Sequence, residues 1–161
     1  TGHAVSIAIN SEVFKKIKSE FTLVVPGDVP GINTEDIDSL IDEVKTKDSP
    51  VGFLTSLVEN PFGYGRVVKN NEEIKIVEEK DCNEIEKKIK EWNPGIYIFK
   101  IPKVFEILNS INANNASKEY YLTDSIGLAQ QSNMKIKAIK IANSDEVLGI
   151  NTAGQLEELE S

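Results

Sequence analysis

Short apolar segments rich in β-branched residues alternate along this chain with segments of helical period. The segments expected to form strands are residues 21–25, 51–58, 67–68, 74–77, 95–99 and 136–141. The first expected helix spans residues 3–18 and is broken near 10–11, and a second begins after a cap at Asn33 or Thr34. Further helices are expected at 83–91, at 123–131, at 152–160 and in the segment that begins at Pro102. Such alternation is typical of an α/β fold, and we expect a mostly parallel sheet.

Two of these segments carry a more specific local signal. Residues 21–25 are apolar without polar alternation, which is typical of a strand buried on both faces. Asn70 and Asn71 separate two apolar runs, and such a pair favours a turn. We therefore expect a β-hairpin over residues 67–77.

Ligands bind beyond the carboxyl ends of the strands in open parallel sheets. This rule directs attention to the loops 26–30, 78–81 and 149–151. Asp28 could hold Mg²⁺ through a carboxylate oxygen, or bond its own backbone as a turn residue. Both interpretations remain open on the residues alone.

Amides and carboxylates near these strand ends suit a ligand rich in hydroxyl groups. Glu78 could accept hydrogen bonds from sugar hydroxyls, although the charged run 78–81 could equally be a solvated surface. Because side chains alternate along extended chain, we expect Glu79 to point away from Glu78 and to stay in solvent. Asn93 and Asn151 can donate and accept at once, or serve as turn and cap residues.

Composition excludes several classes of function. The chain has 18 Lys and Arg against 26 Asp and Glu, a net charge of -8, which argues against a nucleic-acid partner. A single histidine, His3, and a single cysteine, Cys82, exclude zinc sites built from Cys and His clusters and argue against histidine-based triads. Cys82 forms no internal disulfide and fits a cytoplasmic location. No apolar run approaches the roughly 18 residues of a membrane helix, so no membrane partner is expected.

Seven short motifs resemble, in order, those of one enzyme family. They are Thr-Gly-His-Ala at 1–4, Gly-Asp-Val-Pro at 27–30, Asn-Pro-Phe-Gly-Tyr-Gly-Arg at 60–66, Ile-Val-Glu-Glu-Lys-Asp at 76–81, Asn-Pro-Gly-Ile-Tyr at 93–97, Asn-Asn-Ala with Glu-Tyr-Tyr-Leu-Thr-Asp at 114–124, and Val-Leu-Gly-Ile-Asn at 147–151. The family is the uridyltransferase (pyrophosphorylase) domain of the bacterial bifunctional N-acetylglucosamine-1-phosphate uridyltransferase and glucosamine-1-phosphate acetyltransferase. The resemblance covers essentially the whole chain.

The resemblance implies a Rossmann-like nucleotidyltransferase fold, with residues 1–161 forming a partial domain. It implies uridylyl transfer from UTP to N-acetylglucosamine 1-phosphate, giving UDP-N-acetylglucosamine and pyrophosphate, with Mg²⁺ as cofactor. That product feeds peptidoglycan and lipopolysaccharide synthesis. Such transfer needs positioning and charge neutralisation rather than a catalytic histidine.

Individual positions match the family's functional residues. Asp28 and Asn151 match the Mg²⁺ ligands, and Asn151 is also expected at the substrate. The remaining expected substrate-binding residues are Thr1 and Gly2 near the uracil, Gly65, Glu78 and Asn93 at the sugar, and Thr123 beside the same sugar pocket.

The chain departs from the family pattern at four places. The family's opening Gly-rich loop, whose Arg and Lys neutralise the triphosphate, is absent, as is its C-terminal β-helix. We therefore expect this chain to be an N-terminally truncated piece of the enzyme and to be inactive alone. We expect a homo-oligomer only for the full-length enzyme. Pro26 and Pro94 also differ from the family. A sister sugar-1-phosphate nucleotidyltransferase and a non-catalytic sugar-nucleotide-binding module remain as alternatives, which an upstream Gly-rich loop would distinguish.

Overall fold

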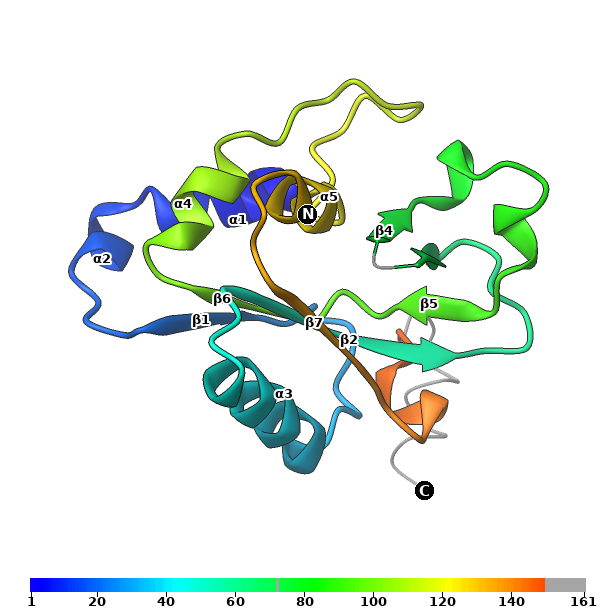
Figure 1. The fold of residues 1–161 in the computed structure, drawn as a ribbon, viewed down its shortest axis with the longest axis horizontal. Coiled ribbons are helices and arrows are strands. Elements are labelled where there is room, and N and C mark those ends of the chain that lie inside the picture. Colours follow the sequence, from blue (N-terminus) through cyan, green and yellow to red (C-terminus); the bar gives the residue numbers. More distant parts are fainter. Residues whose placement is uncertain (72, 150–161) are drawn as a thin grey trace.

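The computed structural model describes residues 1–71 and 73–149, and Figure 1 shows their arrangement. Its α-helices are α1 (Gly2–Ile9), α2 (Glu12–Lys15), α3 (Thr34–Thr46), α4 (Lys103–Leu108) and α5 (Asp124–Gln131). Its strands are β1 (Phe21–Val24), β2 (Val51–Leu57), β3 (Gly65–Asn70), β4 (Glu73–Val77), β5 (Glu91–Asn93), β6 (Tyr97–Lys100) and β7 (Ile136–Lys140). Three 3₁₀ turns, η1 (Glu79–Asp81), η2 (Glu86–Lys88) and η3 (Ser144–Val147), complete the described elements.

The seven strands form one sheet in the order β1-β6-β2-β5-β3-β4, and β7 pairs with β2. Within the described residues only the β2–β7 pair is parallel, so the prediction of a mostly parallel sheet is not confirmed. β3 and β4 follow each other too closely in the chain to pair in parallel, and β5 and β6 both run antiparallel to β2. Alternation of strands and helices in the sequence does not specify these directions.

The sheet divides where the chain passes from β5 to β6. The first half of β2 pairs with β6 and its second half pairs with β5. Residues 93–96 interrupt the pairing of β5 and β6 with β2. In this stretch the Leu54 amide donates a hydrogen bond of 3.1 Å to the Ile96 carbonyl. β1 extends the sheet beyond β6, whereas the β3–β4 hairpin extends it beyond β5. The interruption at 93–96 therefore separates two wings of the sheet.

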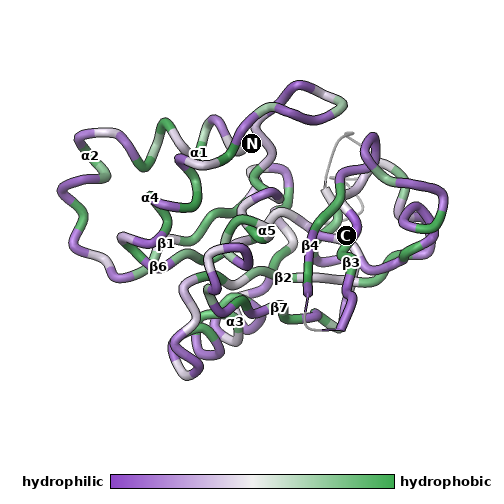
Figure 2. Tube along the Cα trace, turned by 45° about the horizontal axis from the view of Figure 1, so that its top comes forward, coloured by the Kyte–Doolittle hydropathy of each residue, from purple (hydrophilic) through white to green (hydrophobic). Residues whose placement is uncertain are grey.

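Each face of the sheet carries its own hydrophobic core. Helix α3 covers one face, and α1, α4 and α5 lie on the other, as Figure 1 shows. Phe53 and Tyr97 belong to the core beneath α1, α4 and α5, whereas Leu54 and Ile98 belong to the core against α3. This alternation follows the two-residue period of a strand. Figure 2 shows hydrophobic residues along the strands and hydrophilic ones in most connecting loops.

Most of the predicted elements are present, with one clear error. The helices at 34–46 and 124–131 and the hairpin at 65–77 agree with prediction. The helix predicted at 83–91 is wrong, because only η2 forms there before β5 begins. The Asn83 side chain accepts hydrogen bonds from the amides of Ile85 and Glu86, both at 2.9 Å, and closes a local turn instead. The helix predicted at 152–160 lies outside the described residues.

Two finer expectations also need correction. β1 is an edge strand and Leu23 is 40% exposed, so residues 21–25 are not buried on both faces. Pro102 caps α4 rather than opening its first turn. In the described part of the chain, no helix combines the length and apolar character needed to cross a membrane.

Candidate functional site

A cavity of about 340 Å³ lies beside the division of the sheet. Its walls come from the loop after β1, the start of β3, the end of β4, the β5–β6 connection and the segment before α5. Chain segments far apart in the sequence therefore meet at this point.

The structure brings six of the eight expected site residues to this cavity. They are Thr1, Asp28, Gly65, Glu78, Asn93 and Thr123. Gly2 is buried behind the lining, where its amide donates a 2.9 Å hydrogen bond to the Tyr120 carbonyl. Asn151 lies outside the described residues. The geometry thus gathers the expected residues, and their roles as ligands remain predictions.

Glu78 and Thr123 form one polar pair in the cavity wall. The Thr123 hydroxyl donates to Glu78 Oε1 at 2.8 Å, and the Thr123 side chain is buried. Burial raises the pKa of the Glu78 carboxyl above its ordinary value, and the Thr123 hydrogen bond lowers it in part. The carboxylate retains acceptor capacity at Oε2 and at the second lone pair of Oε1.

Asn93 ends β5 at the interruption in the sheet. Its Oδ1 accepts from the Tyr97 hydroxyl at 2.6 Å and from the Gly95 amide at 3.2 Å. Its Nδ2 donates to the Leu54 carbonyl at 3.3 Å. The side chain is held by contacts on both of its polar atoms.

Gly65 faces Asn93 across the β3–β5 pairing. A Cβ at Gly65 would lie 3.6 Å from the Glu78 carboxylate and 3.0 Å from a methyl of Ile76. The Ile76 methyl is thus the tight contact at this position, whereas the Glu78 carboxylate in the cavity wall lies at ordinary contact distance from it.

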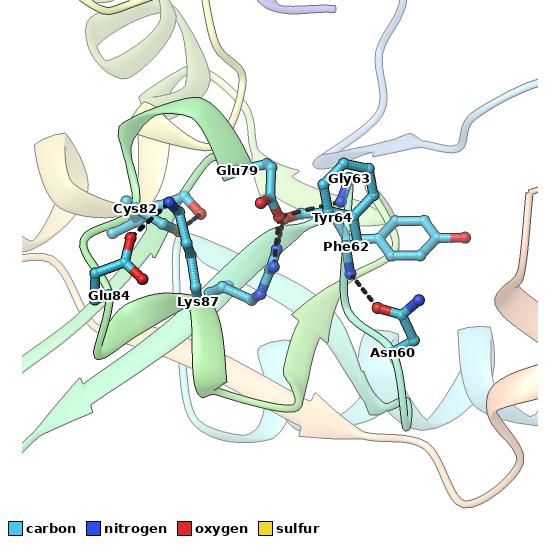
Figure 3. A network of polar contacts seen from close by, with 10 residues as sticks. Asn60, Phe62, Gly63, Tyr64, Glu79, Cys82, Glu84 and Lys87 are labelled. Carbon is cyan, nitrogen blue, oxygen red and sulfur yellow. Dashed lines mark hydrogen bonds and ion pairs between the residues drawn. The ribbon is translucent and has the colours of Figure 1, made fainter.

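The prediction that the Glu79 side chain stays in solvent is wrong. Its Oε2 accepts from Arg66 Nη2 at 2.5 Å and from the Gly63 amide at 3.1 Å, as Figure 3 shows for Gly63. Arg66 is 1% exposed and also donates to the Tyr64 carbonyl. The Arg66 hydrogen bond lowers the pKa of Glu79. The physical reason for the error is that Glu79 begins η1, so the strand alternation stops at Glu78.

Asp28 lies exposed at the cavity, in the loop that follows β1. Among the described residues its carboxylate takes part in no ion pair or side-chain hydrogen bond. No group of three or more potential metal-ligating His, Cys, Asp or Glu side chains occurs in residues 1–71 and 73–149. A metal at Asp28 would need further oxygen ligands, from Asn151 as predicted or from a bound substrate.

Sequence reasoning missed two groups that shape the site. Tyr97 lies in the core, yet its hydroxyl reaches Asn93 at the cavity. Asp81 accepts from the Ala116 amide at 3.0 Å and fixes the loop that leads to Thr123. Both residues lie inside matched motifs, at 93–97 and 76–81, but the contacts that they make depend on tertiary structure.

The chemistry of the described lining favours a ligand with hydroxyl and amide groups. The lining offers carboxylates, an amide, hydroxyls and aromatic rings, and its described members include no Lys or Arg. Phosphate groups would therefore depend on cations from elsewhere, such as a metal ion.

Comparison with known proteins finds relatives that align with nearly the whole chain, beyond the short motifs. No family model matches the chain. The chain is 42% identical over 163 residues to a protein named Bifunctional protein GlmU from Streptococcus sanguinis, and 43% identical over 153 residues to one of the same name from Streptococcus agalactiae. These alignments cover 100% and 94% of this chain but only 35% and 33% of the relatives. The chain thus spans about a third of their length, and the resemblance is confirmed throughout it.

Two solved structures share the fold at low sequence identity. UDP-glucose pyrophosphorylase complexed with UDP-glucose gives a TM-score of 0.68 at 18% identity, covering 99% of this chain and 60% of that one. CMP:2-keto-3-deoxy-manno-octonic acid synthetase complexed with CTP gives a TM-score of 0.66 at 16% identity, covering 98% and 65%. The predicted nucleotidyltransferase fold is thereby confirmed.

Proposed function

We propose that this protein transfers a uridylyl group from UTP to N-acetylglucosamine 1-phosphate, releasing pyrophosphate and forming UDP-N-acetylglucosamine. The observation that carries the proposal is the convergence of Gly65, Glu78, Asn93 and Thr123 on one cavity from four separate segments. The relatives named Bifunctional protein GlmU, which align along the whole chain, support the same assignment.

The cavity would hold the sugar through complementary polar groups. The Glu78 carboxylate would accept from sugar hydroxyl or N–H groups, and charge-assisted hydrogen bonds of this kind contribute about 1.5–3 kcal/mol each. Asn93 and Thr123 stand beside it in the same wall. Thr1 lines the cavity and is expected near the uracil, whereas the Gly2 amide is already engaged with Tyr120.

Asp28 fits a Mg²⁺ ion that is shared with the nucleotide. Mg²⁺ in phosphoryl-transfer sites is commonly held by one or two carboxylates together with substrate phosphate oxygens. The Asp28 carboxylate is exposed and has no ion-pair partner within residues 1–71 and 73–149, which meets that requirement, and Asn151 would be its partner. When bound, the ion would neutralise charge on the phosphate oxygens.

The remaining work of the protein would be positioning. The phosphate oxygen of the sugar phosphate attacks the α-phosphorus of UTP, the bond to the β-phosphate breaks, and pyrophosphate leaves. Phosphoryl transfer needs little covalent chemistry from the protein. These residues would therefore accelerate the reaction mainly by holding the sugar phosphate in line with the bond that breaks. We place the reaction in the cytoplasm, where UTP is available.

The test is a pyrophosphate-release assay on the full-length protein with UTP, Mg²⁺ and a panel of sugar 1-phosphates. We expect N-acetylglucosamine 1-phosphate to be the preferred substrate. Preference for glucose or mannose 1-phosphate would instead identify a sister enzyme. Binding of UDP-N-acetylglucosamine without turnover would identify a non-catalytic binding module.

A further inference from the structure

Tyr97 combines a core side chain with a polar group at the cavity. Tyr97 is 1% exposed, and its ring stacks against Phe53 and Phe99 at centroid distances of 6.1 and 5.8 Å. These contacts hold the ring in place, so the hydroxyl has a fixed position 2.6 Å from Asn93 Oδ1. Burial raises the pKa of Tyr97 well above its ordinary value, which keeps the phenol protonated.

Among the residues that the structure describes, the hydrogen bonds around Asn93 leave it a single free polar group. Its carbonyl oxygen has two lone pairs, and the Tyr97 hydroxyl and the Gly95 amide use both. Its NH₂ group has two hydrogens, and the Leu54 carbonyl takes one. One N–H therefore remains for a ligand.

The same contacts fix which way the amide points. The Gly95 amide can only donate and the Leu54 carbonyl can only accept, so a flipped Asn93 would face like groups at both. The Tyr97 contact is the shortest of the three and occupies the lone pair that a ligand hydroxyl would otherwise use.

We propose that Tyr97 is a positioning residue that holds Asn93 as a hydrogen-bond donor, so that Asn93 presents one N–H to an oxygen of the ligand and accepts nothing from it. With the Glu78 carboxylate as acceptor in the same cavity, the wall offers one donor beside one acceptor. This inference rests on the proposed function, because it takes the sugar phosphate as the ligand.

The donor role is tested by Asn93→Asp in the full-length protein, with N-acetylglucosamine 1-phosphate and UTP titrated separately. An ionised Asp keeps the oxygen that Tyr97 and Gly95 contact but cannot donate. We expect at least about a tenfold loss of sugar-phosphate affinity and little change for UTP. Retained sugar-phosphate affinity would mean that Asn93 acts as an acceptor and would overturn the inference.

The positioning role is tested by a double-mutant cycle of Tyr97→Phe and Asn93→Ala on sugar-phosphate affinity. Asn93→Ala should weaken binding by about 3- to 10-fold, and Tyr97→Phe should add nothing to it. Additive losses would show that the Tyr97 hydroxyl acts independently of Asn93 and would overturn the positioning role. Tyr120→Phe is the matched control, because Tyr120 is 47% exposed and outside the cavity lining.

A ligand-free measurement separates failure of this inference from failure of the proposed function. Asn93→Ala leaves the buried Tyr97 hydroxyl without its acceptor, so the urea midpoint should fall. Adding Tyr97→Phe removes that unpaired group, and the midpoint should partly recover. A double variant that is less stable than Asn93→Ala overturns the coupling, whether or not the protein binds sugar phosphate. Recovery without any sugar-phosphate binding would reject the proposed function instead.

Discussion

The Glu79 carboxylate lies 2.5 Å from the Arg66 guanidinium while its same oxygen accepts from the Gly63 amide at 3.1 Å. One carboxylate thus pairs with a buried cation and fastens the loop that leads into β3. The adjacent Glu78 faces the cavity and pairs with Thr123. Two consecutive glutamates therefore have separate tasks, one structural and one at the candidate site.

Replacing Glu79 by Ala should destabilise the protein. The guanidinium of Arg66, whose side chain is 2% exposed, would lose its carboxylate, and an unpaired buried charge is costly. We expect a loss of about 2–3 kcal/mol, below the usual range for fully buried pairs because Glu79 itself is partly in solvent. Urea unfolding measures it.

Glu84→Ala is the control for this experiment. Glu84 pairs with Lys87 on the surface, where its side chain is 87% exposed. Its removal should leave the urea midpoint almost unchanged. Equal midpoints for Glu79→Ala and wild type would show that Arg66 does not depend on Glu79.

Local patterns predicted the elements that short-range contacts determine. The α3 helix begins where Asn33 accepts from the Asp36 amide at 2.8 Å, a cap that the residues themselves indicate. The place of Glu79 was not predictable, because the alternation rule holds only for extended chain and η1 begins there. The helix at 83–91 failed because the turn at Asn83 and the buried Trp92 together favour η2 followed by β5.

The candidate site was predictable as a set of residues but not as a geometry. Resemblance to the family indicated Glu78, Asn93 and Thr123. The contact of Tyr97 with Asn93 depends on the interruption at 93–96, which brings residues four apart in sequence face to face. Nothing in the local pattern specifies that interruption.

The two glutamates should give stability opposite dependences on pH. Burial raises the Glu78 pKa, so the folded state binds the proton more tightly and loses stability as pH rises from the ordinary value of 4.5 through the raised pKa. Glu78→Gln should therefore gain stability relative to wild type across that range. Unfolding free energies measured from acid to neutral pH check this, and a gap that narrows with rising pH would contradict it.

Glu79→Gln should show the reverse trend. Arg66 lowers the pKa of Glu79, so its stabilisation is complete above the ordinary value of 4.5 and is lost as pH falls through the lowered pKa. The variant should be less stable than wild type at neutral pH, and the two should converge in acid. The same urea titrations at several pH values measure it, and a constant difference would argue against an ionised Glu79.

Asp28→Ala in the full-length protein should raise the Mg²⁺ concentration needed for half-maximal turnover. Loss of the one carboxylate expected to hold the ion should cost at least about tenfold, or roughly 1.4 kcal/mol. The exposed helical Asp42→Ala serves as the control. An unchanged Mg²⁺ dependence would return Asp28 to the role of a turn residue.

Gly95→Ala should destabilise the protein more than Gly63→Ala. Both glycines have positive φ, +83° and +88°, so an Ala is strained at each by about 1–2 kcal/mol. A Cβ at Gly95 would also lie 2.9 Å from Pro26 Cγ, whereas nothing lies within 4 Å of one at Gly63. Because the backbone strain is similar, the difference in urea midpoint reports the contact between the β5–β6 connection and the loop after β1. Equal losses at the two positions would mean that Pro26 moves aside freely and that this wall of the cavity is not rigidly packed.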